Sequence, residues 1–174
     1  MLPSAGSTSG RSRRVGSRRS FPTIPFSDIT VLHVDLSEGF QIEDPAVFVP
    51  WGIGEDELLD LLPMEPHHVS SGYYVIDCTS LSGSKHALGF HFRSDPSKLK
   101  ELEFFRRSNP TYPDLRPSFE DFQRHLELTF GPPTSESSGS EGLPHFRWKV
   151  NEATIDHYVF DRFGPEEHVR ITRS

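Results

Sequence analysis

The stretch PSFEDFQRHLELTFGPP, residues 117–133, carries the strongest local signal of secondary structure in the chain. Its large apolar residues recur at the spacing of one helix face, at Phe119, Phe122, Leu126 and Phe130. Ser118 and Asp121 have the spacing of a capping box, in which the serine side chain caps the first turn. Gly131-Pro132-Pro133 ends the pattern. The stretch predicts an amphipathic helix that begins at Ser118 and turns one apolar face toward a core.

Three strand-like runs follow this helix. The first alternates Phe146, Trp148 and Val150 with polar residues, and the others span Thr154 to Phe163 and His168 to Thr172. The polar stretch from Thr134 to Gly142 is predicted to be a loop.

The same order of elements occurs earlier in the chain. Residues 55–62 have an acidic first turn and end at Pro63, which predicts a short helix. Gly72 to Thr79, His86 to Arg93 and Leu99 to Arg107 are predicted strands. Because the connections between these strands are short, they predict an antiparallel meander rather than parallel crossovers. The chain is therefore predicted to be α+β, an antiparallel sheet with two helices, built from tandem α-β-β-β units at residues 50–107 and 117–174.

The upstream residues divide into two parts. Residues 1–20 are Ser, Gly and Arg with almost no large apolar residue, and we predict a disordered basic tail. Residues 21–174 are predicted to form a single α+β domain. Within it, Thr30 to Leu36 alternates as a half-buried strand does, and Val47-Phe48-Val49 is predicted to be extended.

The charge of the chain is unevenly distributed. The tail holds five arginines and no acid, so the remainder has 13 basic and 25 acidic residues, a formal charge of −12. Nucleic acid is thereby disfavoured as a ligand, except through the arginine-rich tail, because phosphate neutralisation needs Lys and Arg on the domain. A basic protein is the partner class that this charge favours.

The single cysteine, Cys78, lies in the apolar run Tyr73 to Cys78. This placement favours a packed thiol in a reducing compartment, and we expect a cytoplasmic protein. No run approaches the roughly 20 apolar residues of a membrane helix, so no membrane association is expected.

Motifs for catalysis, cofactors and metals are not evident. The chain has no nucleophile elbow and no glycine-rich phosphate loop, and Cys78 has no partner motif. His67 and His68 are adjacent, but His86 and His91 are five apart on one strand and should face opposite sides. We therefore predict no enzyme activity, no catalytic residue, no cofactor and no metal site.

A tripeptide recurs in both units. His91-Phe92-Arg93 and His145-Phe146-Arg147 each place Phe on one side of a strand and His and Arg on the other. If the units pair side by side, the outward residues could combine into a basic, histidine-bearing patch. His91, Arg93, His145 and Arg147 are therefore the candidate binding residues. Chance recurrence of a short tripeptide remains the alternative.

The layout also resembles known proteins. Pro50-Trp51-Gly52 leads into a leucine-rich helix and a meander, and the second helix ends in Phe130-Gly131-Pro132 before a Trp-bearing strand. Over residues 50–174 this resembles the tandem helix-plus-sheet units of BamE-like and beta-lactamase-inhibitor-like proteins. The resemblance implies a bacterial, protein-binding role. It transfers no functional residue, and the chain shows no lipoprotein or signal sequence, although those families are usually exported.

Two functions follow as hypotheses. The first is a non-catalytic protein-binding module, such as an immunity or inhibitor protein whose acidic surface meets a basic target. The rival is a small-ligand-binding protein or an enzyme with a pocket between helix and sheet, using His91, His157 or Cys78. A deep pocket where these residues converge would favour the rival, and an open acidic or aromatic patch would favour the first. The sequence names neither the partner nor the oligomeric state.

Overall fold

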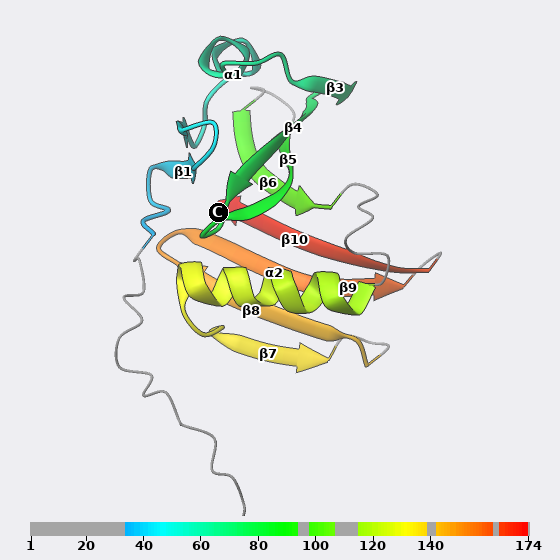
Figure 1. The fold of residues 1–174 in the computed structure, drawn as a ribbon. Coiled ribbons are helices and arrows are strands. Elements are labelled where there is room, and N and C mark those ends of the chain that lie inside the picture. The colour runs from blue at the N-terminus through cyan, green and yellow to red at the C-terminus, as the bar shows by residue number, and fades with distance from the viewer. Residues whose placement is uncertain (1–33, 94–97, 107–114, 139–141, 162–163, 174) are drawn as a thin grey trace, which may run out of the picture. The chain divides into compact units, whose positions relative to one another are not determined.

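The computed structural model of this protein describes residues 34–93, 98–106, 115–138, 142–161 and 164–173. The predicted tail, residues 1–20, lies outside them. The described residues form two helices, a pair of antiparallel strands and an eight-stranded antiparallel sheet (Figure 1). This confirms the predicted α+β fold with two helices and an antiparallel sheet.

The elements before the second helix are β1 (Gly39–Ile42), β2 (Val47–Pro50), α1 (Glu55–Leu61), β3 (His67–Ser70), β4 (Tyr73–Ser80), β5 (Ser84–Arg93) and β6 (Lys98–Phe105). The remaining elements are α2 (Leu115–Phe130), β7 (Ser135–Ser138), β8 (Pro144–Val150), β9 (Ala153–Asp161) and β10 (Pro165–Arg173). Strands β1 and β2 pair with each other, and the large sheet has the order β3-β4-β5-β6-β10-β9-β8-β7.

This strand order shows that one plan is used twice. Each half of the sheet is a helix followed by a four-stranded meander, and the halves join where the last strand of each, β6 and β10, pair antiparallel. At this junction Phe104 lies opposite Val169, and Leu102 lies opposite Ile171. All four side chains are buried, so the two units share one core.

Each unit has one more strand than the sequence predicted. The stretch Thr134 to Gly142, predicted to be a loop, contains β7, and β3 was likewise not predicted. Both strands are short, lie at the edges of the sheet and have only exposed residues. Because neither face is buried, these strands carry no alternation of apolar and polar residues, which is the signal that identifies strands in a sequence.

Helix α2 buries the predicted apolar stripe. Phe122 and Leu126 have no exposed surface, and Figure 1 shows the helix in front of β8 and β9 and running along them. The predicted capping box is wrong, since the helix begins at Leu115 and Ser118 lies inside it. The Ser118 hydroxyl instead donates a hydrogen bond to Glu167 of β10 at 2.5 Å. A long-range contact thus uses the side chain that the local pattern assigned to the cap.

The first unit is covered by α1 and the β1–β2 pair. Helix α1 agrees with its prediction, and Glu57 accepts a hydrogen bond from the Gly54 amide ahead of the first turn at 2.8 Å. Phe40 of β1 packs edge-on against Phe104 of β6, with ring centroids 5.3 Å apart. The Trp51 indole donates a hydrogen bond to the Leu36 carbonyl at 2.8 Å, which links the residue after β2 to the chain before β1.

The predicted strand from Thr30 to Leu36 is wrong over the part that the structure describes. Residues 34–36 are not part of a strand, although Leu36 is buried, and the rest of the predicted strand from Thr30 lies outside the described residues. Among the described residues, no helix is long and apolar enough to span a membrane.

Candidate functional site

The sheet face turned away from α2, here called the back face, places three of the predicted binding residues, His91, His145 and Arg147, beside acidic partners. Side chains alternate between the two faces along each strand, and opposed residues share a face. Because Leu88, Phe104 and Val169 face the core, their neighbours in sequence face the other way. The back face includes Tyr73, His91, Glu101, Glu103, Tyr158, Asp156, His145, Arg147, His168 and Arg170.

Charges of alternating sign cross the back face in one row. Glu103 of β6 lies opposite Arg170 of β10, Arg170 opposite Asp156 of β9, and Asp156 opposite Arg147 of β8. The Arg170 guanidinium contacts Glu103 at 3.0 Å, and the Arg147 Nε donates to Asp156 at 2.7 Å. The row crosses the β6–β10 junction, so it joins the two units by side-chain contacts as well as by the backbone.

Glu103 is the centre of this network. Its carboxylate accepts hydrogen bonds from His91 at 3.0 Å and from the Tyr73 hydroxyl at 3.2 Å, besides the contact with Arg170. Burial raises the pKa of Glu103, but the nearby His168 imidazole, the hydrogen bond from His91 and the charge of Arg170 together lower it well below its usual value. Glu103 is therefore a carboxylate at neutral pH.

Three of the four predicted binding residues, His91, His145 and Arg147, occupy this face but do not form one cluster. His91 lies on β5 and pairs with Glu103, whereas His145 and Arg147 lie on β8 and both contact Asp156 Oδ1 at 2.7 Å. Three strands, β6, β10 and β9, separate the two groups. Arg93 lies opposite Lys98, and its side chain is outside the described residues. The carboxylates that accompany the cations come from other strands and could not be paired with them from sequence. A binding role for the four residues stays a prediction.

The three residues of the rival hypothesis do not converge. His91 faces the back, while His157 on β9 and Cys78 on β4 face the core, with β5, β6 and β10 between them. Cys78 is buried, as expected for a packed thiol. Burial and the nearby charges of Asp77, Glu43 and Asp44 raise the pKa of its thiol to about 12, so it is not a nucleophile near neutral pH.

His157 belongs to a buried chain of hydrogen bonds that attaches α2 to the sheet. Its Nε2 donates to Glu167 Oε1 at 2.9 Å, its Nδ1 lies 2.8 Å from the Gln123 side-chain amide, and the Phe119 ring stacks on it at 3.9 Å. Glu167 also accepts the bond from Ser118. The carboxylate thus lies between serine and histidine, whereas activation of a serine requires the histidine in that place. The chain of bonds positions the helix.

The histidines are distributed as the spacing predicted. His86 lies opposite Cys78 on the core side and His91 opposite Tyr73 on the back face, so the two face opposite sides of β5. Among the described residues, no group of three or more His, Cys, Asp or Glu side chains is arranged to hold a metal ion.

A second surface was missed by the sequence analysis. Residues 34–84, here called the acidic segment, contain no Lys or Arg, and their acids are Asp35, Glu38, Glu43, Asp44, Glu55, Asp56, Glu57, Asp60, Glu65 and Asp77. Among the described residues, this segment also carries every exposed large hydrophobic side chain except Phe160: Phe48, Leu59, Leu61, Met64 and Val69. The net charge of all residues after the tail, taken as one number, hides this local lack of Lys and Arg. A window of charge along the chain would have found it.

A third feature is an apolar groove beside α2. It has a volume of about 660 Å³ and is lined by apolar side chains that include Phe119, Phe146, Val159 and Leu143. The charged side chains at its rim are largely paired within α2, as Arg116 is with Glu120 at 3.5 Å. None of His91, His157 and Cys78 lines it.

Comparison with known proteins gives no family. No family model matches the chain, and the curated proteins contain no significant match. Among solved structures, the crystal structure of a DUF4309 family protein, YjgB, from Bacillus subtilis is similar over 70% of this chain and 78% of that chain, with 10% identity and a TM-score of 0.39. Similarity at that level supports no conclusion about fold or function. The resemblance to BamE-like and beta-lactamase-inhibitor-like proteins stays a prediction.

Proposed function

We propose that this protein is a non-catalytic module that binds a basic partner protein. The observation that carries the proposal is the acidic segment, in which exposed hydrophobic side chains coincide with a long run that has no Lys or Arg. Clustered acids without cations repel one another, and a basic partner relieves that repulsion and is attracted from a distance. The exposed hydrophobic side chains supply the area whose burial gives affinity.

A binding role agrees with the state of two residues of the rival hypothesis, Cys78 and His157. The Cys78 thiol is buried and protonated, and the buried His157 is occupied in holding α2. An inhibitor or immunity protein acts by covering a surface of its target, which needs no reactive group. As part of the same proposal we place the protein in the bacterial cytoplasm: its one cysteine suits a reducing compartment, and its layout resembles bacterial binding proteins.

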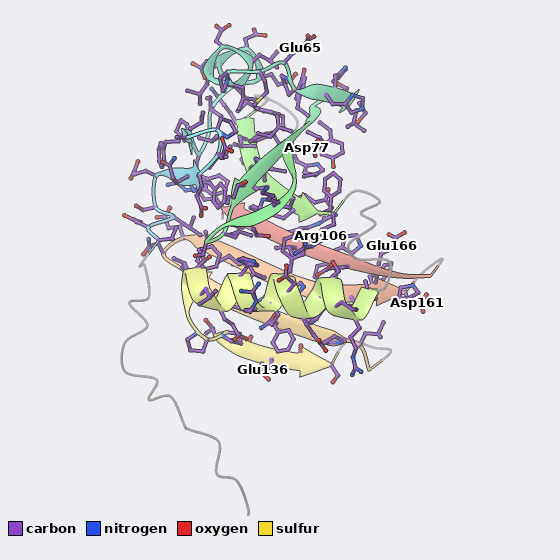
Figure 2. All side chains as sticks on the ribbon, in the orientation of Figure 1. Glu65, Asp77, Arg106, Glu136, Asp161 and Glu166 are labelled. Atoms are coloured by element: carbon purple, nitrogen blue, oxygen red, sulfur yellow. The ribbon has the colours of Figure 1, made fainter. Side chains whose placement is uncertain are left out.

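The test is affinity capture with the full chain, followed by measurement on the identified partner. Reversing three acids of the acidic segment (Asp56→Lys, Asp60→Lys and Glu65→Lys) should weaken binding of that partner at least about tenfold, and added salt should weaken binding to the unaltered protein. The matched control reverses Glu136, Asp161 and Glu166, which are exposed acids outside the acidic segment and are labelled in Figure 2 on β7, β9 and β10. An acidic partner, or equal losses in both variants, would contradict the proposal.

The groove beside α2 favours a second candidate function, binding of a small apolar ligand. Its volume lies within the range of ligand pockets, and its floor is aromatic and aliphatic. If this function holds, a neutral apolar fluorescent probe should bind saturably with one site per chain, and Leu143→Glu should abolish that binding. The control is Leu61→Glu, an exposed leucine that does not line the groove. Weak, unsaturable fluorescence in all three proteins would dismiss this candidate.

A further inference from the structure

The acidic segment contains a groove, here called the α1 groove, between α1 and the start of the sheet. It has a volume of about 590 Å³ and is lined by Leu59, Leu62, Pro63, Met64, Glu65, Pro66, His68 and Tyr74. Pro63 follows the end of α1, and the chain then runs to β3 at the sheet edge. The groove therefore has a helix on one side and the outermost strands of the sheet on the other.

The wall made by the sheet is held in place by local contacts. His68 and Tyr74 face each other across β3 and β4, and their rings stack with centroids 5.0 Å apart. The Tyr74 hydroxyl donates to Glu55 of α1 at 3.1 Å, which fixes the ring relative to the helix. A preformed wall of this kind reduces the ordering that binding requires.

Helix α1 offers a second apolar side where a surface helix is usually polar. Leu58 and Leu62 are buried beneath it, but Leu59 is 38% exposed, and Met64 on the following turn is 40% exposed. Both exposed side chains line the α1 groove. Methionine is flexible and polarisable, which suits a surface that accommodates another molecule's side chain.

The charge around the groove has one sign. Glu65 lines it, and Figure 2 shows this residue on the turn that follows α1. Asp56 and Asp60 lie on α1 itself, and no Lys or Arg among the described residues is within ion-pair distance of these three acids. Lys98 does approach α1, but its Nζ pairs with Glu57 at 4.0 Å. An occupant that matches the groove is therefore both apolar and cationic.

We propose that the α1 groove receives a short basic amphipathic segment of the partner protein. An apolar side chain of that segment packs between Leu59 and Met64, and its Lys or Arg side chains contact Glu65 and Asp60. This inference rests on the proposed function and deepens it, because it names the part of the acidic segment that makes the central contact. The apolar contact determines which segment binds, and the acids attract it and orient it.

The test uses a synthetic 14-residue amphipathic peptide of lysine and leucine, with fluorescence anisotropy measured on the full chain. The L59Q/M64Q double variant should weaken binding at least about tenfold, whereas L61Q, a change at an equally exposed leucine of the same helix outside the groove, should weaken it less than about threefold. The variant E65Q should weaken binding and reduce its dependence on salt. A peptide with serine in place of leucine should bind at least about tenfold more weakly than its parent.

Several results would overturn the inference. Equal losses in L61Q and L59Q/M64Q, or equal affinity for the leucine and serine peptides, would mean that the acidic surface binds without using the groove. If the triple charge reversal abolishes binding of the captured partner but L59Q/M64Q does not, the assignment to the α1 groove is wrong and the proposed function stands. If neither variant weakens binding of the partner, the groove assignment and the proposed function are both wrong. If the peptide binds more tightly after the five arginines of residues 11–19 are changed to serine, the chain's own tail competes for the α1 groove. The tail would then be the occupant of the groove, and the proposal of a partner segment would be wrong.

Discussion

Replacing Phe122 with alanine should lower the free energy of unfolding by roughly 3–5 kcal/mol. Its ring has no exposed surface and lies on the core side of α2, where it contacts His86 and His157 at centroid distances of 5.8 and 6.4 Å. The Arg106 guanidinium also lies 4.3 Å above the ring. The substitution leaves a cavity and removes this cation–π contact, so both effects destabilise the fold.

Urea unfolding of the two proteins at neutral pH measures this effect. The control is Phe160→Ala, which removes the same side chain from a position that is 49% exposed on β9, and it should cost less than about 1 kcal/mol. A similar small cost for Phe122→Ala would mean that α2 packs with a different face toward the sheet.

Lowering the pH from 7 to 5 should reduce the free energy of unfolding by about 2 kcal/mol through His86 alone. Burial is the main cause that lowers the pKa of this imidazole from 6.5 to about 3, and the charges of Arg106 and His125 lower it further. In the unfolded chain His86 therefore binds a proton below about pH 6.5, whereas in the folded chain it does so only below about pH 3. Stability from this residue is present above pH 6.5 and is lost progressively as the pH falls.

The variant His86→Gln tests the assignment, because glutamine does not titrate but can still bond to Ser80, whose hydroxyl lies 2.9 Å from His86 Nε2. Urea unfolding at several pH values between 7 and 5 should show a shallower decline in the variant. Some decline remains, since burial also lowers the pKa of His157. An unchanged decline in His86→Gln would show that His86 is not the source.

The elements that the sequence predicted are those with one buried face. Helix α2 has its apolar stripe at helical spacing, and β5 alternates around Leu88 and Phe90, so each is readable from local order. Strands β3 and β7 have no buried face and were missed. Their place in the sheet comes from backbone pairing with β4 and β8, which no pattern of side chains records.

The candidate surfaces likewise combine features that can be read from the sequence with features that only the tertiary structure shows. The run without Lys or Arg across residues 34–84 is a property of the sequence, and so are the leucines on both sides of α1. The α1 groove is not, because it needs Tyr74 of β4 to lie beside Met64. On the back face, the sequence indicates that His91 and Arg147 point away from the core. Only the strand register shows that Glu103 and Asp156 lie against them.

The sequence by itself determined the order of the two helices and of the three strands with a buried face that follow each, the sides of α2 and β5 that are buried, and the excess of acid in the folded part. These follow from residues within a few positions of one another, where the period of the backbone decides which side chains share a face. The tertiary structure alone decided that β6 pairs with β10, that Ser118 bonds to Glu167 rather than capping a helix, and that the charges of the back face are shared between strands. Those contacts join residues far apart in the chain, and they form because the two units must bury their apolar faces in one core.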